Sequence, residues 1–216
     1  MRSNTIVGLT KRGKCSGITK IFNKENLGYA KAVNQGLKES LGKSFKYTCF
    51  RNNDLYFSTN WLEGLLSEFE EKVVAVYPLG MPSYTQLFGK STREIFEKNK
   101  LRGLEYEIDF LEKDFEKNIK QICMENQTSV YDRFLQFLSD HCVLVKTNFM
   151  DRIGYFADER YGKYGSNDVD ICWEIFSHGG KIKETNKSFV YYFRHKSLVD
   201  NIANRSELLT GSSKIL

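Results

Sequence analysis

The run Val-Val-Ala-Val-Tyr-Pro at residues 73–78 constrains the fold of this chain more than any other feature of its sequence. A nearly continuous apolar run of this length is typical of a strand that is buried on both faces of a sheet. The preceding sequence predicts strands over residues 18–22 and 45–50 and amphipathic helices over residues 29–38 and 61–69. This alternation predicts an α/β domain with a mixed, mostly parallel sheet flanked by helices.

The alternation breaks over residues 91–130. Charged side chains of both signs occupy half of positions 91–120, which predicts one or two surface helices inserted into the fold. This helical insertion is either a cap, an interaction face or a solvated excursion. Regular structure resumes with strands predicted over 140–146, 181–185 and 188–193, helices over 148–153 and 168–177, and a final helix over 197–209 with a tail to 216.

The bulk composition fits a single domain over residues 1–216, because this length and the 41% apolar content can supply a buried core. No apolar run approaches the roughly 18–20 residues that span a bilayer. The first residues do not have the pattern of a signal peptide, which predicts a cytoplasmic location. Five scattered cysteines without a C-x-x-C pair argue against a disulfide framework and a structural zinc site.

The positive charge is concentrated at the start of the chain. The net charge is +5, and the first fifty residues hold ten Lys or Arg against two acids. Such a basic lobe faces phosphate groups, an anionic membrane or nucleic acid, or else is a plain solvated surface. The chain has neither an RNA-binding aromatic signature nor a zinc finger, so we expect no nucleic-acid partner.

Asn52, Asn53 and Asp54 directly follow a predicted strand. Open α/β sheets bind ligands at the carboxyl ends of their strands. A carboxylate flanked by two amides can hold a hard divalent cation through oxygen and leave positions for phosphate oxygens. The same residue types also suit a plain turn. The triplet by itself leaves both interpretations open.

Asp168 and Asp170 begin a predicted helix, and His195 follows the last predicted strand. Asp in a first turn can cap the free backbone N–H groups. Capping needs one acid, so the pair indicates that the other projects into a cleft, where it could act as a general base. His195 could be a metal ligand, a base or a packed polar residue, and His141 is interpreted as structural.

Taken in order, these residues belong to a longer pattern. N-L-G-Y-A-x-A-V-N-Q-G occupies residues 26–36, N-N-D 52–54 and W-L 61–62. C-V-L-V-K at 142–146, G-Y-F-A-D-E-R-Y at 154–161 and N-D-V-D-I-C-W-E at 167–174 follow. This order resembles the inverting family 2 glycosyltransferases of GT-A fold. It is most similar to their rhamnosyl- and galactofuranosyl-transferase-like branch.

The resemblance implies a Rossmann-like fold of the nucleotide-diphospho-sugar transferase type. It implies transfer of a sugar from a nucleotide-diphosphate donor to a hydroxyl of a glycan or lipid-linked acceptor. Asp168 would be the general base, and Asp170 would orient the base or the acceptor. Asp54 would bind Mn²⁺ or Mg²⁺, and His195 would complete the metal shell. The donor would be bound by Asn26, Gly28, Asn34, Asn52, Asn53 and Asp54.

The chain departs from the family pattern in three places. Asn52 stands where many relatives carry Asp, and Asn167 stands where Glu usually precedes the base. Residues 4–7 would align just after the family's second strand, so we expect the N-terminal nucleotide-binding strands to be lacking. The alternative is therefore a catalytically weak or inactive relative that binds a glycan or a partner. An uncovered sheet edge would also predict a homodimer, and the basic lobe would suit peripheral contact with the inner face of a membrane.

Overall fold

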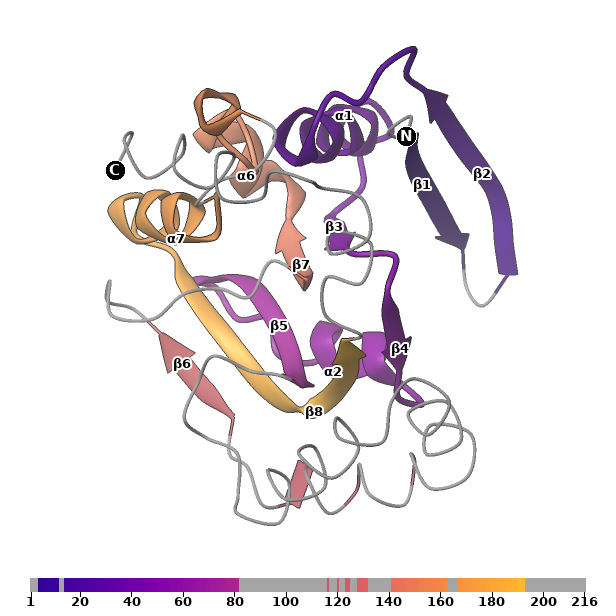
Figure 1. Cartoon of the computed structure of the whole chain (residues 1–216). Coiled ribbons are helices and arrows are strands. Elements are labelled where there is room, and N and C mark those ends of the chain that lie inside the picture. Colours follow the sequence, from indigo (N-terminus) through magenta and orange to yellow (C-terminus); the bar gives the residue numbers. More distant parts are fainter. Residues whose placement is uncertain are drawn as a thin grey trace, which may run out of the picture. The chain divides into compact units, whose positions relative to one another are not determined.

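The computed structural model describes residues 4–11, 14–81, 116, 120, 123, 124, 128–131, 141–162 and 167–192 (Figure 1). His195, the predicted final helix and most of the predicted insertion lie outside these residues. The chain divides into two compact units, each built from segments that are distant in sequence. The described part of the helical unit lies within Met1–Thr48 and Val145–His178, and that of the sheet unit within Cys49–Leu144 and Gly179–Lys196.

The helical unit combines a hairpin with three helices and one short 3-10 turn. Its elements are β1 (Asn4–Lys11), β2 (Lys14–Phe22), α1 (Tyr29–Gly42), α6 (Thr147–Ile153), η1 (Glu159–Tyr161) and α7 (Asn167–Ser177). The strands β1 and β2 pair antiparallel and form a separate two-stranded sheet. The strand predicted over 18–22 is the second half of β2, whereas β1 was not predicted. Helix α1 lies beside β1 and α6 (Figure 1).

The helical unit buries the apolar faces that the helical periodicity predicted. Leu37 of α1, Met150 of α6 and Ile171 and Ile175 of α7 are all at most 3% exposed. Helix α6 ends at Gly154, whose φ of 93° lies in the left-handed region that favours glycine. The helices predicted over 29–38, 148–153 and 168–177 are therefore confirmed, with α1 extended by one turn.

The sheet unit carries a six-stranded mixed sheet in the order β3-β7-β5-β8-β4, with β6 paired to β8. Strand β8 runs parallel to β5 and antiparallel to β4 and β6. The elements are β3 (Tyr47–Arg51), β4 (Leu55–Phe57), α2 (Trp61–Leu66), β5 (Val73–Met81), β6 (Ser129–Tyr131), β7 (Cys142–Lys146) and β8 (Lys181–Tyr192). The first residues of β3 and the last of β7 are counted with the helical unit.

The apolar run at 73–78 forms the buried strand that the sequence predicted. Every residue from Val73 to Gly80 of β5 is buried. Strand β5 lies inside the sheet, between β7 and β8, so neither of its edges is open. The run is therefore confirmed as the centre of the fold.

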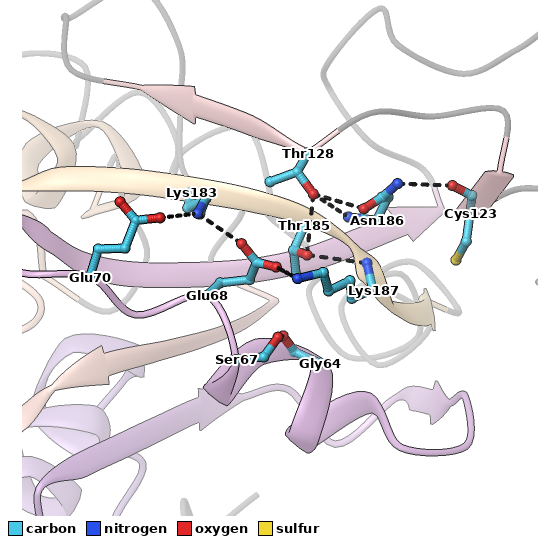
Figure 2. Close-up of polar contacts among 10 residues, drawn as sticks. All are labelled: Gly64, Ser67, Glu68, Glu70, Cys123, Thr128, Lys183, Thr185, Asn186 and Lys187. Carbon is cyan, nitrogen blue, oxygen red and sulfur yellow. Dashed lines mark hydrogen bonds and ion pairs between the residues drawn. The ribbon is translucent and has the colours of Figure 1, made fainter.

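Strand β8 corrects the prediction of two separate strands over 181–185 and 188–193. Thr185 pairs with Pro78 and Phe189 with Leu79, so residues 186–188 bulge out of a single strand. The polar residues of this bulge interrupted the apolar pattern. Asn186 of this bulge bonds instead to residues of the predicted insertion: its side-chain amide donates to the Cys123 carbonyl and accepts from the Thr128 hydroxyl (Figure 2).

A group of charged residues ties β8 to the turn after α2. Lys183, 7% exposed, forms ion pairs with Glu68 and Glu70, each at 2.8 Å, and Lys187 binds Glu68 at 2.6 Å (Figure 2). Helix α2 packs closely on the same strand: a Cβ at Gly64 would overlap the Lys187 carbonyl. We call Glu68, Glu70, Lys183 and Lys187 the β8 ion network.

Three further predictions are corrected by the sheet unit. The helix predicted over 61–69 ends at Leu66, where the chain turns toward β5. Strand β4 was not predicted, because three residues are too few for an alternating pattern. Residues 129 and 130, predicted within the helical insertion, belong with Tyr131 to strand β6, whereas Glu116, Lys120, Cys123 and Met124 are helical as predicted.

The path of strands ends at β3 and β4, and homodimerisation through a sheet edge stays a prediction. Within the described ranges, none of the helices has the length and apolar character needed to cross a membrane.

Candidate functional site

The Asn52–Asp54 triplet forms the bend that joins β3 to β4. The Asn52 backbone N–H donates to the His141 carbonyl at 2.8 Å, and its side-chain amide donates to the Tyr192 hydroxyl at 3.4 Å. Leu55, which follows Asp54, pairs with Tyr192 across β4 and β8. The triplet therefore lies beside the end of β8, the strand that leads to His195.

A flat aromatic stack supports this bend. The His141 and Tyr192 rings lie 5.2 Å apart between centroids and 6° from parallel. Gly80 of β5 leaves room for the imidazole, since a Cβ at this position would lie 2.6 Å from His141 Nε2. Burial lowers the pKa of His141 to about 4, so its ring is neutral at pH 7. The structural interpretation of His141 agrees with this position.

Asn26 and Gly28 shape the start of α1. The Asn26 side-chain oxygen accepts from the Gly28 N–H at 2.9 Å, and Gly28 caps the helix with a φ of 84°. This backbone conformation favours glycine, because a Cβ would be strained there. A contact of either residue with a donor stays a prediction.

The buried side chain of Asn34 links α1 to the segment after α6 by hydrogen bonds. Its amide nitrogen donates to the Ala157 carbonyl at 2.8 Å and to Glu159 Oε1 at 3.3 Å. Its amide oxygen accepts from the backbone N–H groups of Phe156 and Ala157 at 3.0 and 3.2 Å. These four bonds use the full hydrogen-bonding capacity of an asparagine side chain. Its predicted role in donor binding is untested and stays a prediction.

Asp168 lies half-buried in the first turn of α7. One carboxylate oxygen accepts from the Val169 N–H at 3.0 Å. Burial raises the pKa of Asp168 above its ordinary value, although the backbone hydrogen bonds oppose this shift. A carboxylate that is held in place and made more basic has the properties of a general base.

Asp170, two residues further along α7, accepts hydrogen bonds from two tyrosines. The Tyr155 hydroxyl donates to Oδ2 at 3.1 Å and the Tyr161 hydroxyl to Oδ1 at 3.4 Å. Burial raises the pKa of Asp170 and the nearby charge of Asp158 adds to this, while the two phenols lower it. Sequence reasoning missed both tyrosines as site residues. Their position in the G-Y-F-A-D-E-R-Y motif is the sequence feature that could have identified them.

The two units hold different parts of the predicted site. Asn26, Gly28, Asn34, Asp168 and Asp170 belong to the helical unit, and the Asn52–Asp54 triplet belongs to the sheet unit. Sequence reasoning also missed the aromatic support of the triplet by Tyr192. Neither that residue nor Gly80 carries a recognisable motif.

The donor set of the triplet suits a hard divalent cation that has other ligands as well. Asp54 offers carboxylate oxygens, and Asn52 uses its amide nitrogen on Tyr192, which leaves its carbonyl oxygen as the metal-binding atom. In the described part of the chain, no three His, Cys, Asp or Glu side chains come together as a metal group. A carboxylate and an amide oxygen are ligand types that a hard divalent cation prefers.

Comparisons with known proteins bear on the family and the fold of this chain. The sequence pattern of the family described as Glycosyl transferase family 2 matches residues 7–138. A crystal structure of GalNAc-T7 with UDP, GalNAc and Mn²⁺ resembles this chain with a TM-score of 0.50 and 14% sequence identity. No curated protein matches the chain.

The structural likeness covers 79% of this chain and 31% of the GalNAc-T7 chain, so this chain spans less than a third of that protein. At this identity the likeness bears on the fold, and the predicted GT-A fold is confirmed. The family pattern covers more than half of the sequence, including α1, the Asn52–Asp54 triplet and β5. The chain belongs to glycosyl transferase family 2.

Proposed function

We propose that this protein transfers a sugar from a nucleotide-diphosphate sugar to a hydroxyl group of a glycan or lipid-linked acceptor, with inversion at the anomeric carbon. The observation that carries the proposal is the position and the environment of the Asp168 carboxylate. It is a half-buried carboxylate, fixed at the start of α7, whose pKa is raised by burial. Family membership supplies the class of reaction.

Asp168 would accept the proton of the acceptor hydroxyl while the hydroxyl oxygen attacks the anomeric carbon. The bond from that carbon to the diphosphate breaks in the same displacement, and the nucleoside diphosphate leaves on the opposite side. A single displacement inverts the configuration. General base catalysis of this kind contributes about 10²- to 10⁴-fold to the rate.

Asp54, with Asn52 and His195, would hold Mn²⁺ or Mg²⁺ against the diphosphate. A divalent cation there supplies positive charge that stabilises the departing diphosphate. Two observations support this assignment: Asn52 and Leu55 both contact the end of β8, and the structurally similar GalNAc-T7 was crystallised with UDP and Mn²⁺. His195 lies three residues beyond the end of β8, outside the described residues.

Product formation with a panel of UDP-, GDP- and dTDP-sugars in the presence of Mn²⁺ tests the proposal. Asp168→Asn and Asp54→Ala should each lower kcat by about 100-fold or more. Asp151→Asn and Glu63→Gln remove exposed charges from α6 and α2 and should leave the rate unchanged. Transfer that survives both Asp168→Asn and Asp54→Ala would refute the proposal.

Calorimetry with UDP, GDP and dTDP plus Mn²⁺ separates this function from the alternative of a non-catalytic binding module. A transferase should bind one of the three nucleotides, and Asp168→Asn should bind it as tightly as the wild type, since the base acts on the acceptor. Absence of binding by all three nucleotides would favour the binding module.

A further inference from the structure

Both oxygens of the Asp170 carboxylate are bound by one short segment of the chain. Tyr155 and Tyr161, which bind Oδ2 and Oδ1 respectively, lie at the two ends of residues 155–161. Hydrogen bonds to an ionised carboxylate are stronger than those between neutral groups. We call residues 155–161 the tyrosine segment. It is held to α7 at both of its ends.

The middle of the tyrosine segment is held from the other side. Asn34 of α1 forms four hydrogen bonds with residues 156–159. Asp158 caps η1 by accepting from the Arg160 N–H at 2.8 Å, and its carboxylate also binds the Arg160 side chain. The segment is therefore held by α7 at its two ends and by α1 in its middle.

The surroundings of Asp170 keep its two tyrosines in the protonated form that donates hydrogen bonds to its carboxylate. The charged groups that face it or its tyrosines are Asp158, Arg160 and Glu174. Burial and the negative charge of Asp170 raise the pKa values of Tyr155 and Tyr161. Both phenols therefore keep their protons at neutral pH and continue to donate to the carboxylate.

The side chains of the two acids of α7 leave the helix in different directions. Successive residues of a helix are rotated by about 100°, so side chains two positions apart leave on nearly opposite sides. Asp170 is turned toward the tyrosine segment and has both oxygens bound there. Asp168 therefore leaves the helix on a different side.

We propose that Asp170 is a positioning residue: it orders the tyrosine segment, through Tyr155 and Tyr161, as one wall of the acceptor site. The assignment of that wall to the acceptor rests on the proposed function, in which Asp168 is the base. Asn34 has a positioning role in the same wall. The ordering of the tyrosine segment by Asp170 does not depend on which ligand the protein binds.

Amide hydrogen exchange tests the ordering without any activity measurement. The double variant Tyr155→Phe/Tyr161→Phe and the single variant Asp170→Asn should each speed exchange of residues 155–162 by about 10-fold or more, the effect of losing a hydrogen bond to a charged group. Tyr131→Phe is the matched control, because it removes a tyrosine–carboxylate bond to Glu184 in the sheet unit. Unchanged exchange in both variants would overturn the inference.

Kinetics test the link to the acceptor. The double tyrosine variant should raise KM for the acceptor about 10-fold and change kcat by less than about 2-fold, because the segment orients the acceptor without touching the reacting atoms. Tyr131→Phe should change neither constant.

The pH profile distinguishes a positioning residue from a base. Loss of the two phenol bonds raises the pKa of Asp170 further. If Asp170 were the base, the acid limb of kcat in the double variant would move to higher pH, which would overturn the inference; we expect this limb to stay in place. If the wild type transfers no sugar, the proposed function fails, and the exchange measurement still decides the role of Asp170.

Discussion

At the scale of single residues, the Asn52–Asp54 triplet is held in place by residues that have no predicted role in the reaction. The Asn52 N–H is fixed by the His141 carbonyl, and the His141 ring lies against Tyr192. The His141 ring fits there only because Gly80 has no side chain. A glycine in a buried strand thus makes room for the ring that stacks on Tyr192 beside the bend between β3 and β4.

Gly80→Ala should therefore destabilise the folded protein. Its Cβ would lie 2.6 Å from His141 Nε2, and overpacking of this kind costs about 1–3 kcal/mol in the free energy of unfolding. The matched control is Gly42→Ala at the end of α1, where a Cβ meets nothing within 4 Å. Urea denaturation measures both, and a Gly80→Ala variant as stable as the control would contradict the packing described here.

Asp168 should reduce the stability of the folded protein at neutral pH. Its pKa is raised by burial, so the folded chain binds more protons than the unfolded chain between the two pKa values. Stability then falls as the pH rises through this window, which begins near the unfolded value of about 3.9.

Asp168→Asn removes this effect and keeps an oxygen for the Val169 N–H. Its free energy of unfolding should exceed that of the wild type at pH 7, and the difference should shrink toward pH 4. Denaturant titrations at several pH values give both quantities. A variant less stable than the wild type at pH 7 would show that burial is not the dominant effect at this carboxylate.

At the scale of elements, β8 organises the sheet unit. It pairs with β4, β5 and β6, contacts α2, and absorbs a three-residue bulge within its length. The β8 ion network fastens this strand to the turn between α2 and β5 (Figure 2). Lys183 and Glu68 form the buried centre of this network, at 7% and 4% exposure.

Glu68→Gln should lower the free energy of unfolding by about 3 kcal/mol at pH 7, because it leaves Lys183 buried without its nearest buried counter-charge. Burial by itself would raise the pKa of Glu68, but the hydrogen bonds and charges of Lys183 and Lys187 lower it overall. A lowered carboxyl pKa gives stability that is present above the unfolded value of about 4.3 and is lost as the pH falls through the folded value.

The difference between wild type and Glu68→Gln should therefore be full at pH 7 and decrease below about pH 4. Its sign is opposite to that at Asp168, because Glu68→Gln is expected to be less stable than the wild type. Glu71→Gln, an exposed neighbour on the same turn, is the control and should be neutral. A loss of stability that does not depend on pH would assign the effect to packing rather than to charge.

At the scale of the whole molecule, each unit is assembled from separate stretches of chain. The division falls within two strands, between Thr48 and Cys49 of β3 and between Leu144 and Val145 of β7. Both Leu144 and Val145 are buried. Neither unit can unfold without disrupting residues of a strand that continues into the other.

Urea denaturation should therefore show one cooperative transition, which the two tryptophans can report separately. Trp61 lies in α2 of the sheet unit and Trp173 in α7 of the helical unit. The variants Trp173→Phe and Trp61→Phe each leave one tryptophan. Each fluorescence midpoint is corrected for the change in stability that its substitution causes, as measured by far-UV circular dichroism, and the two corrected midpoints should coincide. Clearly separated midpoints would mean that the units unfold independently.

The sequence by itself determined the elements whose buried positions follow a regular pattern of apolar residues along the chain. Strand β5 followed from an apolar run, and α1 and α7 followed from helical periodicity and flanking glycines. The order of motifs determined the family and the GT-A fold, since those residues lie in the right succession. These features depend on neighbours a few residues apart, which local patterns describe well.

Only the tertiary structure decided which distant residues meet. Strand β8 continues through its bulge, where Asn186 binds Cys123 and Thr128, some sixty positions away. The four bonds of Asn34, more than 120 residues from their partners, and the space that Gly80 leaves for His141 have no local signature. Such contacts form when remote segments close on one another. Their geometry is set by packing, and the spacing of residues along the chain does not contain it.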